Sequence, residues 1–184
     1  IEGNTLTEEQ VLQHIRGELR LPSSQKYLQQ EIDNIIHACN EASDMVAAGT
    51  PPELSVARIK LLNKQVLNRL NVAEEVVPGQ VRTYSVVVGN VYRGAPAEDC
   101  DCLLDQLCDW LNGPDFVPAD DLKEYKAVYA ILRAIIAHLY LAWIHPFGDG
   151  NGRTARLVEF EILTSSGLPS TVTNLLSSHY NLTR

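Results

Sequence analysis

The sequence predicts an all-α protein, a helical bundle that carries one small β-hairpin. Apolar residues recur at helical spacing through most of the 184 residues, and this period is typical of helices. Residues 81–88 (VRTYSVVV) are instead rich in β-branched side chains and lead into the turn pair Gly89-Asn90. We therefore expect a hairpin that returns through residues 91–93. The length and the composition, with 45% hydrophobic and 21% charged residues, fit a single globular domain over residues 1–184.

Three helices are expected before the hairpin. Thr7 and Gln10 stand three residues apart, as in a capping box, so the first helix should begin after Thr7 and end near residue 20. The second helix is expected over residues 27–48, where apolar side chains repeat at helical spacing before a glycine. The third helix is expected over residues 51–70, and the two prolines Pro51 and Pro52 should begin it.

Three further helices are expected after the hairpin. The first of them covers residues 98–112. Its inward face should consist of Cys102, Leu103, Leu107, Trp110 and Leu111. The central helix should run from Asp120 or Asp121 to Ile144, and the last helix should span residues 151–167. The apolar stripe expected on the central helix consists of Leu122, Tyr125, Tyr129, Leu132, Ile136, Leu139 and Trp143.

Charge and cysteine usage disfavour several classes of function. Lys and Arg number 15 against 23 Asp and Glu, and the net charge of −8 counts against a nucleic-acid-binding surface. The four cysteines form no CxxC pair, which disfavours a zinc site and fits reduced thiols in the cytoplasm. Residues 127–144 are as long as a short membrane span, but Arg133 and His138 in their interior favour the central helix of a soluble core. We therefore expect a cytoplasmic protein with neither a nucleic-acid nor a membrane partner.

The chain begins with Ile1-Glu2-Gly3-Asn4 and not with methionine. These residues also lack the basic and then apolar pattern of a signal peptide. We therefore expect that the chain is a piece of a longer protein.

The residues that carry chemistry are concentrated in the segment His145–Arg153 (HPFGDGNGR), between two expected helices. Pro146 ends the first helix, because a residue that precedes proline disfavours the helical backbone conformation. The three glycines Gly148, Gly150 and Gly152 allow backbone N–H groups to converge on one point and to form an anion-binding nest. The nest leads directly into a helix N-terminus, where unsatisfied N–H groups and the helix dipole favour a phosphate.

Charged side chains around this loop sharpen the prediction to a nucleotide site. Arg153 and Arg156 share one face of the new helix, where two cations oppose the helix dipole unless a polyphosphate lies between them. Asp149 adds a carboxylate among phosphate-binding groups, as expected where Mg²⁺ bridges a carboxylate and phosphates. His145 is the natural general base, because an unperturbed imidazole titrates near neutral pH.

Each of these residues also has a plain structural explanation. His145 alone could end a helix, and Asp149 alone could form a turn. Phe147 could anchor the loop in the core, and Asn151 could serve only as the N-cap of the following helix. The joint occurrence of base, carboxylate, glycine nest and paired arginines within twelve residues favours the functional interpretation.

The string HPFGDGNGRTAR, from His145 to Arg156, resembles the signature of the Fic family, HPFx[D/E]GN[G/K]RxxR, at every defined position. The resemblance implies the all-helical Fic bundle with a hairpin flap over the active site, and a catalytic loop and helix over residues 145–166. It implies transfer of AMP from ATP to a Ser, Thr or Tyr hydroxyl of a target protein, with His145 as the base. Asp149 would then be the Mg²⁺ ligand, and Arg153 would clamp phosphates.

The same resemblance implies which residues hold ATP. They are Phe147, Gly148, Gly150, Asn151, Gly152, Arg153 and Arg156. Gly152 discriminates within the family, because Doc-like relatives, which transfer a phosphoryl group, typically have lysine at this position. Glycine therefore favours AMP transfer.

The first residues resemble the end of the inhibitory motif [S/T]xxxE[G/N] of one Fic subclass, so residues 1–6 are expected to be a truncated inhibitory segment. The resemblance implies that Glu2 pairs with Arg156 and removes a clamp for the γ-phosphate. Two other hypotheses stay open. Glu2 could orient a water for the hydrolytic removal of AMP from a modified target, or the chain could be a non-catalytic regulator that binds nucleotide or a partner.

Residues 80–93 look like the flap of the family. An extended protein target would pair along Val86, Val87, Val88 and Gly89, because an unpaired strand edge can accept another strand. A long loop with strand character is the plainer alternative for this segment. The expected partners are a protein substrate, the chain itself in self-modification, and a second copy in a homo-oligomer.

Overall fold

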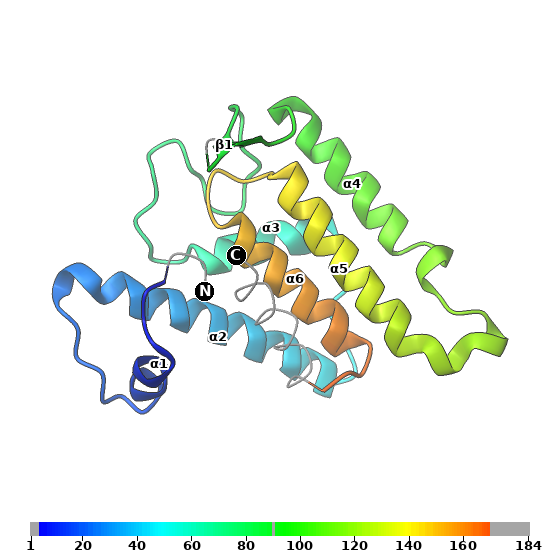
Figure 1. The fold of residues 1–184 in the computed structure, drawn as a ribbon, viewed down its shortest axis with the longest axis horizontal. Coiled ribbons are helices and arrows are strands. Elements are labelled where there is room, and N and C mark those ends of the chain that lie inside the picture. The colour runs from blue at the N-terminus through cyan, green and yellow to red at the C-terminus, as the bar shows by residue number, and fades with distance from the viewer. Residues whose placement is uncertain (1–3, 90, 170–184) are drawn as a thin grey trace.

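The structure, a computed structural model, describes residues 4–89 and 91–169 (Figure 1). Within these ranges it contains six α-helices and one two-stranded antiparallel hairpin. The predicted fold class, a helical bundle with a small hairpin, is confirmed. Four short 3₁₀ segments connect the helices, at Ser23–Gln25, Ala97–Asp99, Pro114–Phe116 and Asp120–Tyr125.

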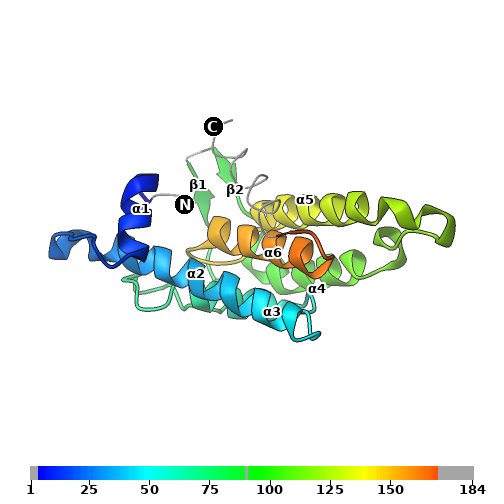
Figure 2. The same ribbon diagram turned by 90° about the horizontal axis from the view of Figure 1, so that it is seen from below.

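Helix α6 (Asn151–Ser165) lies in the middle of the molecule. It packs against α5 (Lys126–Ile144) on one side and against α2 (Lys26–Ala47) and α3 (Val56–Val66) on the other. Figure 2 shows these layers from below. Helix α4 (Cys100–Leu111) covers α5 and also contacts α3. Helix α6 is therefore enclosed along most of its length by the rest of the bundle.

Helix α1 (Glu8–Ile15) begins as predicted but ends earlier. The Thr7 hydroxyl accepts a hydrogen bond from the Gln10 N–H, and the Gln10 side chain accepts one from the Thr7 N–H, at 3.2 and 2.9 Å. The predicted capping box is thus confirmed. The helix lies beside α2, where the His14 ring contacts the Asp33 carboxylate at 2.7 Å.

The prediction that the third helix begins at Pro51 and Pro52 is wrong. Helix α3 begins at Val56, because the Ser55 hydroxyl accepts a hydrogen bond from the Arg58 N–H at 3.2 Å and caps the first turn. The prolines lie in the connection from α2 and are not part of the helix.

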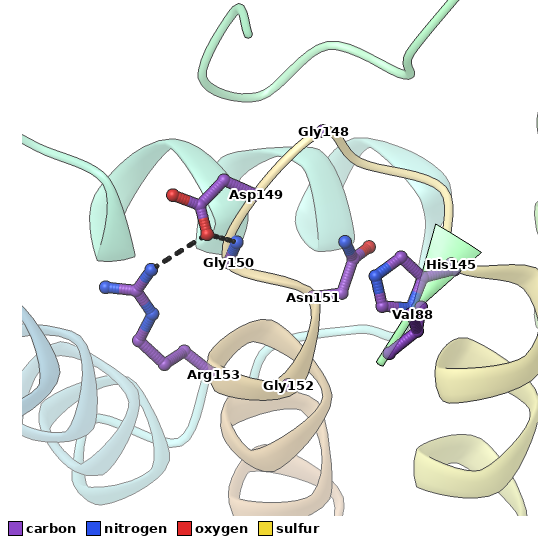
Figure 3. Close-up of a pocket in the computed structure, with 8 residues that line it drawn as sticks. All are labelled: Val88, His145, Gly148, Asp149, Gly150, Asn151, Gly152 and Arg153. Carbon is purple, nitrogen blue, oxygen red and sulfur yellow. Dashed lines mark hydrogen bonds and ion pairs between the residues drawn. The ribbon is translucent and has the colours of Figure 1, made fainter. Parts of the chain in front are cut away.

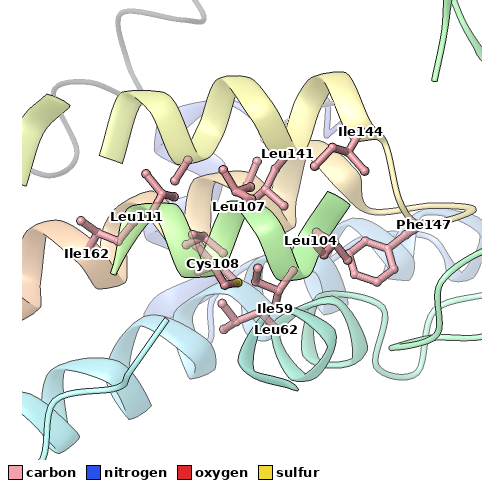
Figure 4. Close-up of a cluster of buried hydrophobic side chains, with 14 of the residues drawn as sticks. Ile59, Leu62, Leu104, Leu107, Cys108, Leu111, Leu141, Ile144, Phe147 and Ile162 are labelled. Atoms are coloured by element: carbon pink, nitrogen blue, oxygen red, sulfur yellow. The ribbon is translucent and has the colours of Figure 1, made fainter. Parts of the chain in front are cut away.

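Buried apolar side chains from α3, α4, α5 and α6 form one core (Figure 4). Members labelled there are Ile59, Leu62, Leu104, Leu107, Cys108, Leu111, Leu141, Ile144, Phe147 and Ile162. Phe147 follows α5 and is only 1% exposed. The core therefore anchors the loop between α5 and α6, as expected for this phenylalanine.

The apolar stripe predicted for helix α5 is wrong at five of its seven positions, although Ile136 packs against the core. Leu132 and Trp143 are both 50% exposed, and Leu122, Tyr125 and Leu139 are exposed as well. The buried face of α5 consists of Ala130, Ala134, Ala137, Leu141 and Ile144. Small side chains let α5 approach α6 closely, because the distance between helix axes depends on the residues at the contact. The large side chains consequently lie on the opposite face.

The inward face predicted for α4 is wrong at Cys102 and Trp110, which are exposed. The buried residues of α4 are Cys100, Leu104, Leu107, Cys108 and Leu111. Trp110 packs on the surface against Phe116 and Tyr140, with ring centroids 5.4 and 5.5 Å apart. The indole ring of Trp110 therefore has aromatic packing partners outside the core.

Within the described ranges, one helical segment, Asp120–Ile144, is long and apolar enough to cross a membrane by length and composition. The protein itself buries 28% of its most apolar window. Core helices of soluble proteins pass the same test, so a single segment of this kind is weak evidence for a membrane span.

The hairpin is shorter than predicted. Strand β1 (Val87–Val88) pairs with strand β2 (Tyr92–Arg93) in antiparallel fashion. The prediction of a strand over residues 81–88 is wrong, because the start of this segment bonds to the connection between α5 and α6: the Arg82 N–H donates to the Pro146 carbonyl at 2.9 Å. The plainer alternative, a loop with strand character, therefore describes residues 81–86.

Candidate active site

The connection between α5 and α6 lines a pocket of about 240 Å³ beside strand β1 (Figure 3). The residues that line it are Val88, His145, Gly148, Asp149, Gly150, Asn151, Gly152 and Arg153. The structure thus brings most of the expected site residues together around one cavity. A second pocket, of about 680 Å³, lies on the α2 side, and Asp149 and Arg153 line both pockets.

Two residues that were expected to hold ATP, Phe147 and Arg156, do not line the pocket beside β1. Phe147 is in the core beneath the loop. Arg156 follows Arg153 on α6 and is half-buried. Glu2 lies outside the described residues, so its pairing with Arg156 stays a prediction.

His145 caps the C-terminus of α5 in a left-handed backbone conformation, with φ 50° and ψ 57°. For a residue other than glycine, a left-handed backbone conformation costs about 1–3 kcal/mol and persists only where the surrounding structure holds it. The ring Nδ1 lies 3.4 Å from the carbonyl oxygen of Ala142. A carbonyl only accepts, so this contact favours a proton on Nδ1 and leaves Nε2 as the basic nitrogen.

Arg82, which the sequence analysis did not single out, holds this strained connection in place. Its guanidinium donates to the carbonyls of His145 at 2.8 Å, of Tyr84 at 2.6 Å and of Ala95 at 2.6 Å. A fourth, longer bond reaches Ile144 at 3.4 Å. The side chain is 4% exposed. One arginine therefore joins the end of α5 to the chain segment before the hairpin and to the segment after it.

The side chain of Asn151 closes the loop from within. Its amide nitrogen donates to the Phe147 carbonyl at 2.8 Å, and its oxygen accepts from the Phe147 N–H at 2.9 Å. The N-cap of α6 is Gly150, which has no side chain, so the alternative that Asn151 serves as N-cap is wrong. Because both ends of the amide already have protein partners, a phosphate would meet Asn151 through its backbone N–H.

Two of the glycines are required for different reasons. Gly150 has φ +75°, a left-handed conformation that glycine adopts without strain. Gly148 is required by space, because a Cβ there would clash with the Tyr84 hydroxyl and would lie 2.8 Å from a methyl group of Val76. Burial, and next the charge of Glu75, raises the pKa of Tyr84, so the hydroxyl above Gly148 stays protonated at neutral pH.

Asn63 on α3 fixes the start of α6, and the sequence analysis missed this residue too. Its amide nitrogen donates to the Asp149 carbonyl at 2.9 Å and to the Thr154 hydroxyl at 3.2 Å. The first intrahelical bond of α6 runs from the Thr154 N–H to the Gly150 carbonyl at 2.9 Å. The N–H groups of residues 151–153 precede that bond, and N–H groups at this position of a helix are the ones that can take an anion as their partner.

Arg153 lies between two carboxylates. Nη1 is 2.7 Å from Oε1 of Glu31 on α2, and Nη2 is 3.2 Å from Oδ1 of Asp149 (Figure 3 shows the second contact). Asp149 Oδ1 also accepts from the Gly150 N–H at 2.5 Å. The side chains of Arg153 and Glu31 are nearly buried, whereas that of Asp149 is 47% exposed. The accessible carboxylate of Asp149 therefore lies at the pocket beside β1, and the nearly buried carboxylate of Glu31 lies on the other side of Arg153.

The donor set fits a shared magnesium site better than an all-protein one. Among the described residues no group of three or more His, Cys, Asp or Glu side chains could hold a metal ion. Mg²⁺ often takes only one or two carboxylates and completes its shell with water and phosphate oxygens. Asp149, exposed at the pocket beside the N-terminus of α6, could supply such a carboxylate.

Strand β1 presents an open edge next to the pocket. The Val86 carbonyl accepts from the Gly94 N–H and the Val88 carbonyl from the Val91 N–H, both at 3.2 Å, so these two residues face β2. Backbone groups of successive strand residues point to opposite sides, and those of Val87 therefore face outward. The Tyr92 hydroxyl donates to the Trp143 carbonyl at 2.6 Å and ties the hairpin to the end of α5.

A model described as the Fic/DOC family matches residues 53–163. Two curated relatives are protein adenylyltransferase fic-1 of Caenorhabditis briggsae and protein adenylyltransferase Fic of Nematostella vectensis. The first is 31% identical over 94% of this chain and 31% of its own length, and the second is 26% identical over 97% and 39%. The chain thus spans about a third of the length of these relatives.

Solved structures of the same kind superpose on the chain. Fic-1 from C. elegans has a TM-score of 0.69 and 29% identity, over 91% of this chain and 46% of its own. A Fic-domain-containing signaling protein from Bacteroides thetaiotaomicron has a TM-score of 0.68 at 22% identity, over 96% of this chain and 65% of its own. The second match shows a shared fold alone.

Proposed function

Because this chain belongs to the Fic/DOC family, we propose that it is a protein adenylyltransferase, which transfers AMP from ATP to a hydroxyl side chain of a target protein. Its relatives carry the name protein adenylyltransferase. The observation that carries the proposal is one pocket lined by His145, Asp149, Arg153 and the N-terminus of α6.

The N-terminus of α6 would bind the phosphates of ATP. Its first N–H groups have no intrahelical acceptor, and the helix dipole favours negative charge at this end. Gly148, Gly150 and Gly152 line the pocket at this end of the helix. Arg153 adds a cation, and Asp149 would hold Mg²⁺. Bound there, Mg²⁺ would supply charge neutralisation to the phosphates.

His145 would act as the general base. With its proton on Nδ1, Nε2 accepts the proton of the target hydroxyl, and the oxygen attacks the α-phosphorus. The bond from that phosphorus to the oxygen that bridges it to the β-phosphate breaks, and pyrophosphate leaves. The left-handed backbone at His145, held by Arg82, directs this side chain toward the pocket next to β1.

Two finer roles belong to the same proposal. The open edge of β1 at Val87 would align an extended target so that its hydroxyl faces His145. Glu2 would pair with Arg156 and compete with the γ-phosphate for that guanidinium. The intact pattern of base, carboxylate and arginines disfavours nucleotide binding without catalysis, and removal of AMP from a target is the alternative enzyme hypothesis.

Incubation with labelled ATP, Mg²⁺ and a native cell extract tests the proposal. We expect label on the chain itself or on an extract protein. The His145→Ala variant should lose at least about a hundredfold of this labelling, since general-base catalysis contributes about 10²–10⁴-fold, while ATP affinity is retained.

The matched control is His37→Ala, which removes an exposed histidine of α2 away from the pocket and should leave labelling unchanged. Equal labelling by His145→Ala would contradict the role of the base. Release of AMP from a modified target without any transfer would favour the hydrolase. Nucleotide binding without either reaction would favour the regulator.

A further inference from the structure

Glu31 and Arg153 form a nearly buried ion pair at the back of the site. Their side chains are 11% and 10% exposed, and Arg153 Nη1 lies 2.7 Å from Glu31 Oε1. The sequence signature contains Arg153 but gives no indication of Glu31, which lies 122 residues earlier on α2. The pair sits between the two pockets that meet at the start of α6.

The second oxygen of Glu31 has a different partner. Asn4 donates through Nδ2 to Glu31 Oε2 at 2.9 Å and to the Leu28 carbonyl at 2.9 Å. Its own Oδ1 accepts from the Leu6 N–H at 3.0 Å. Asn4 is therefore fixed on α2, and it holds the Glu31 carboxylate in one orientation while the other oxygen faces Arg153.

Asp149 competes with Glu31 for the same guanidinium. It lies four residues before Arg153, and its Oδ1 is already 3.2 Å from Nη2. Without Glu31 the guanidinium would be able to turn fully onto Asp149, because a two-oxygen contact is the favoured geometry of an arginine–carboxylate pair. Both oxygens of Asp149 would then be engaged, and the carboxylate would be lost as a metal ligand.

We propose that Glu31 is a positioning residue that draws Arg153 away from Asp149 and so keeps the Asp149 carboxylate available to Mg²⁺, with Asn4 holding Glu31 in place. This role rests on the proposed function, since it concerns the same nucleotide site. It makes the magnesium requirement of nucleotide binding depend on a residue of α2 and on a contact from the N-terminal segment.

The test measures binding of a fluorescent ATP analogue to the full chain as Mg²⁺ is raised, so that the readout is independent of turnover. Glu31→Ala should raise the half-saturating Mg²⁺ concentration about tenfold, and Asn4→Ala about threefold. Glu31→Gln should stay within threefold of the unchanged chain, because its amide oxygen still accepts from Arg153. Simple electrostatics predicts the opposite for Glu31→Ala, since removal of a negative charge would favour the polyphosphate.

Asp44→Ala is the matched control, because it removes one exposed carboxylate of α2 away from the site and should not move the Mg²⁺ dependence. An unchanged dependence in a Glu31→Ala chain that still binds the analogue would overturn the positioning role alone. Failure of the unchanged chain to bind the analogue at any Mg²⁺ concentration would overturn the proposed function and this role with it.

Discussion

Two nearly buried arginines flank the loop between α5 and α6, and they are held in different ways. Arg82, on the hairpin side, donates only to backbone carbonyls in the contacts described, at 2.6–3.4 Å. Arg153, on the α2 side, contacts two carboxylates at 2.7 and 3.2 Å. Both are less than a tenth exposed, so burial does not distinguish them; the chemistry of their partners does.

This difference indicates what each side of the site can do. Carbonyl oxygens of a folded backbone cannot leave, and the bonds of Arg82 therefore form a permanent part of the scaffold around His145. A carboxylate at the pocket mouth can exchange its cation for a metal ion, and a guanidinium can exchange its carboxylate for a phosphate. The hairpin side thus fixes the backbone of His145, whereas we expect the α2 side to respond to charge.

The largest expected effect comes from removal of the scaffold arginine. Arg82→Ala leaves buried carbonyls of Tyr84, Ala95 and His145 without this donor, and each unsatisfied acceptor costs about 1–3 kcal/mol. We expect the free energy of unfolding to fall by at least about 3 kcal/mol, together with the loss of AMP transfer per folded molecule. Denaturant unfolding and the labelling assay measure the two effects.

Arg93→Ala is the control for Arg82→Ala, because it removes an exposed arginine of β2 and should leave both quantities nearly unchanged. Arg82→Lys should be intermediate in stability, since one ammonium cannot span carbonyls that a planar guanidinium reaches together. Full transfer by folded Arg82→Ala protein would contradict the view that these bonds set the pose of His145.

An effect of intermediate size on AMP transfer is expected for Glu2, whose predicted partner is Arg156. If Glu2 pairs with Arg156, Glu2→Gly frees a guanidinium for the γ-phosphate and should raise AMP transfer roughly ten- to a hundredfold, since a charged hydrogen bond is worth about 1.5–3 kcal/mol. Self-labelling with ATP measures it. Glu18→Gly, at an exposed position outside the helices, should have no such effect, and equal rates for both variants would exclude autoinhibition by Glu2.

The smallest effect is expected at the hairpin edge. Val87→Pro removes one outward N–H, worth about 0.5–1.5 kcal/mol, so labelling of a target should fall roughly two- to tenfold while nucleotide affinity is unchanged. Val87 is 58% exposed, and Val91→Ala alters a still more exposed valine of the same hairpin as a control. Undiminished target labelling in Val87→Pro would show that targets do not dock by strand pairing here.

The two sides of the site also differ from the loop itself in how far the sequence predicted them. The site loop was predictable because its base, carboxylate, glycines and Arg153 lie within nine consecutive residues, so that local chain geometry alone brings them together. The capping box at Thr7 was predictable for the same reason. The buried face of α5 was not predictable, because the size of an apolar side chain does not decide whether that side chain contacts a neighbouring helix.

By itself the sequence determined the order of the helices, the existence of the hairpin and the set of chemical groups in the loop between α5 and α6, because periodicity, caps and short motifs act over a few residues. Only the tertiary structure decided which partners hold that loop. Arg82 meets His145 across 63 residues, Asn63 meets Asp149 across 86, and Glu31 meets Arg153 across 122. Such contacts depend on how the helices pack, because α2 and α3 meet α6, and the hairpin segments meet the end of α5, only in the folded bundle.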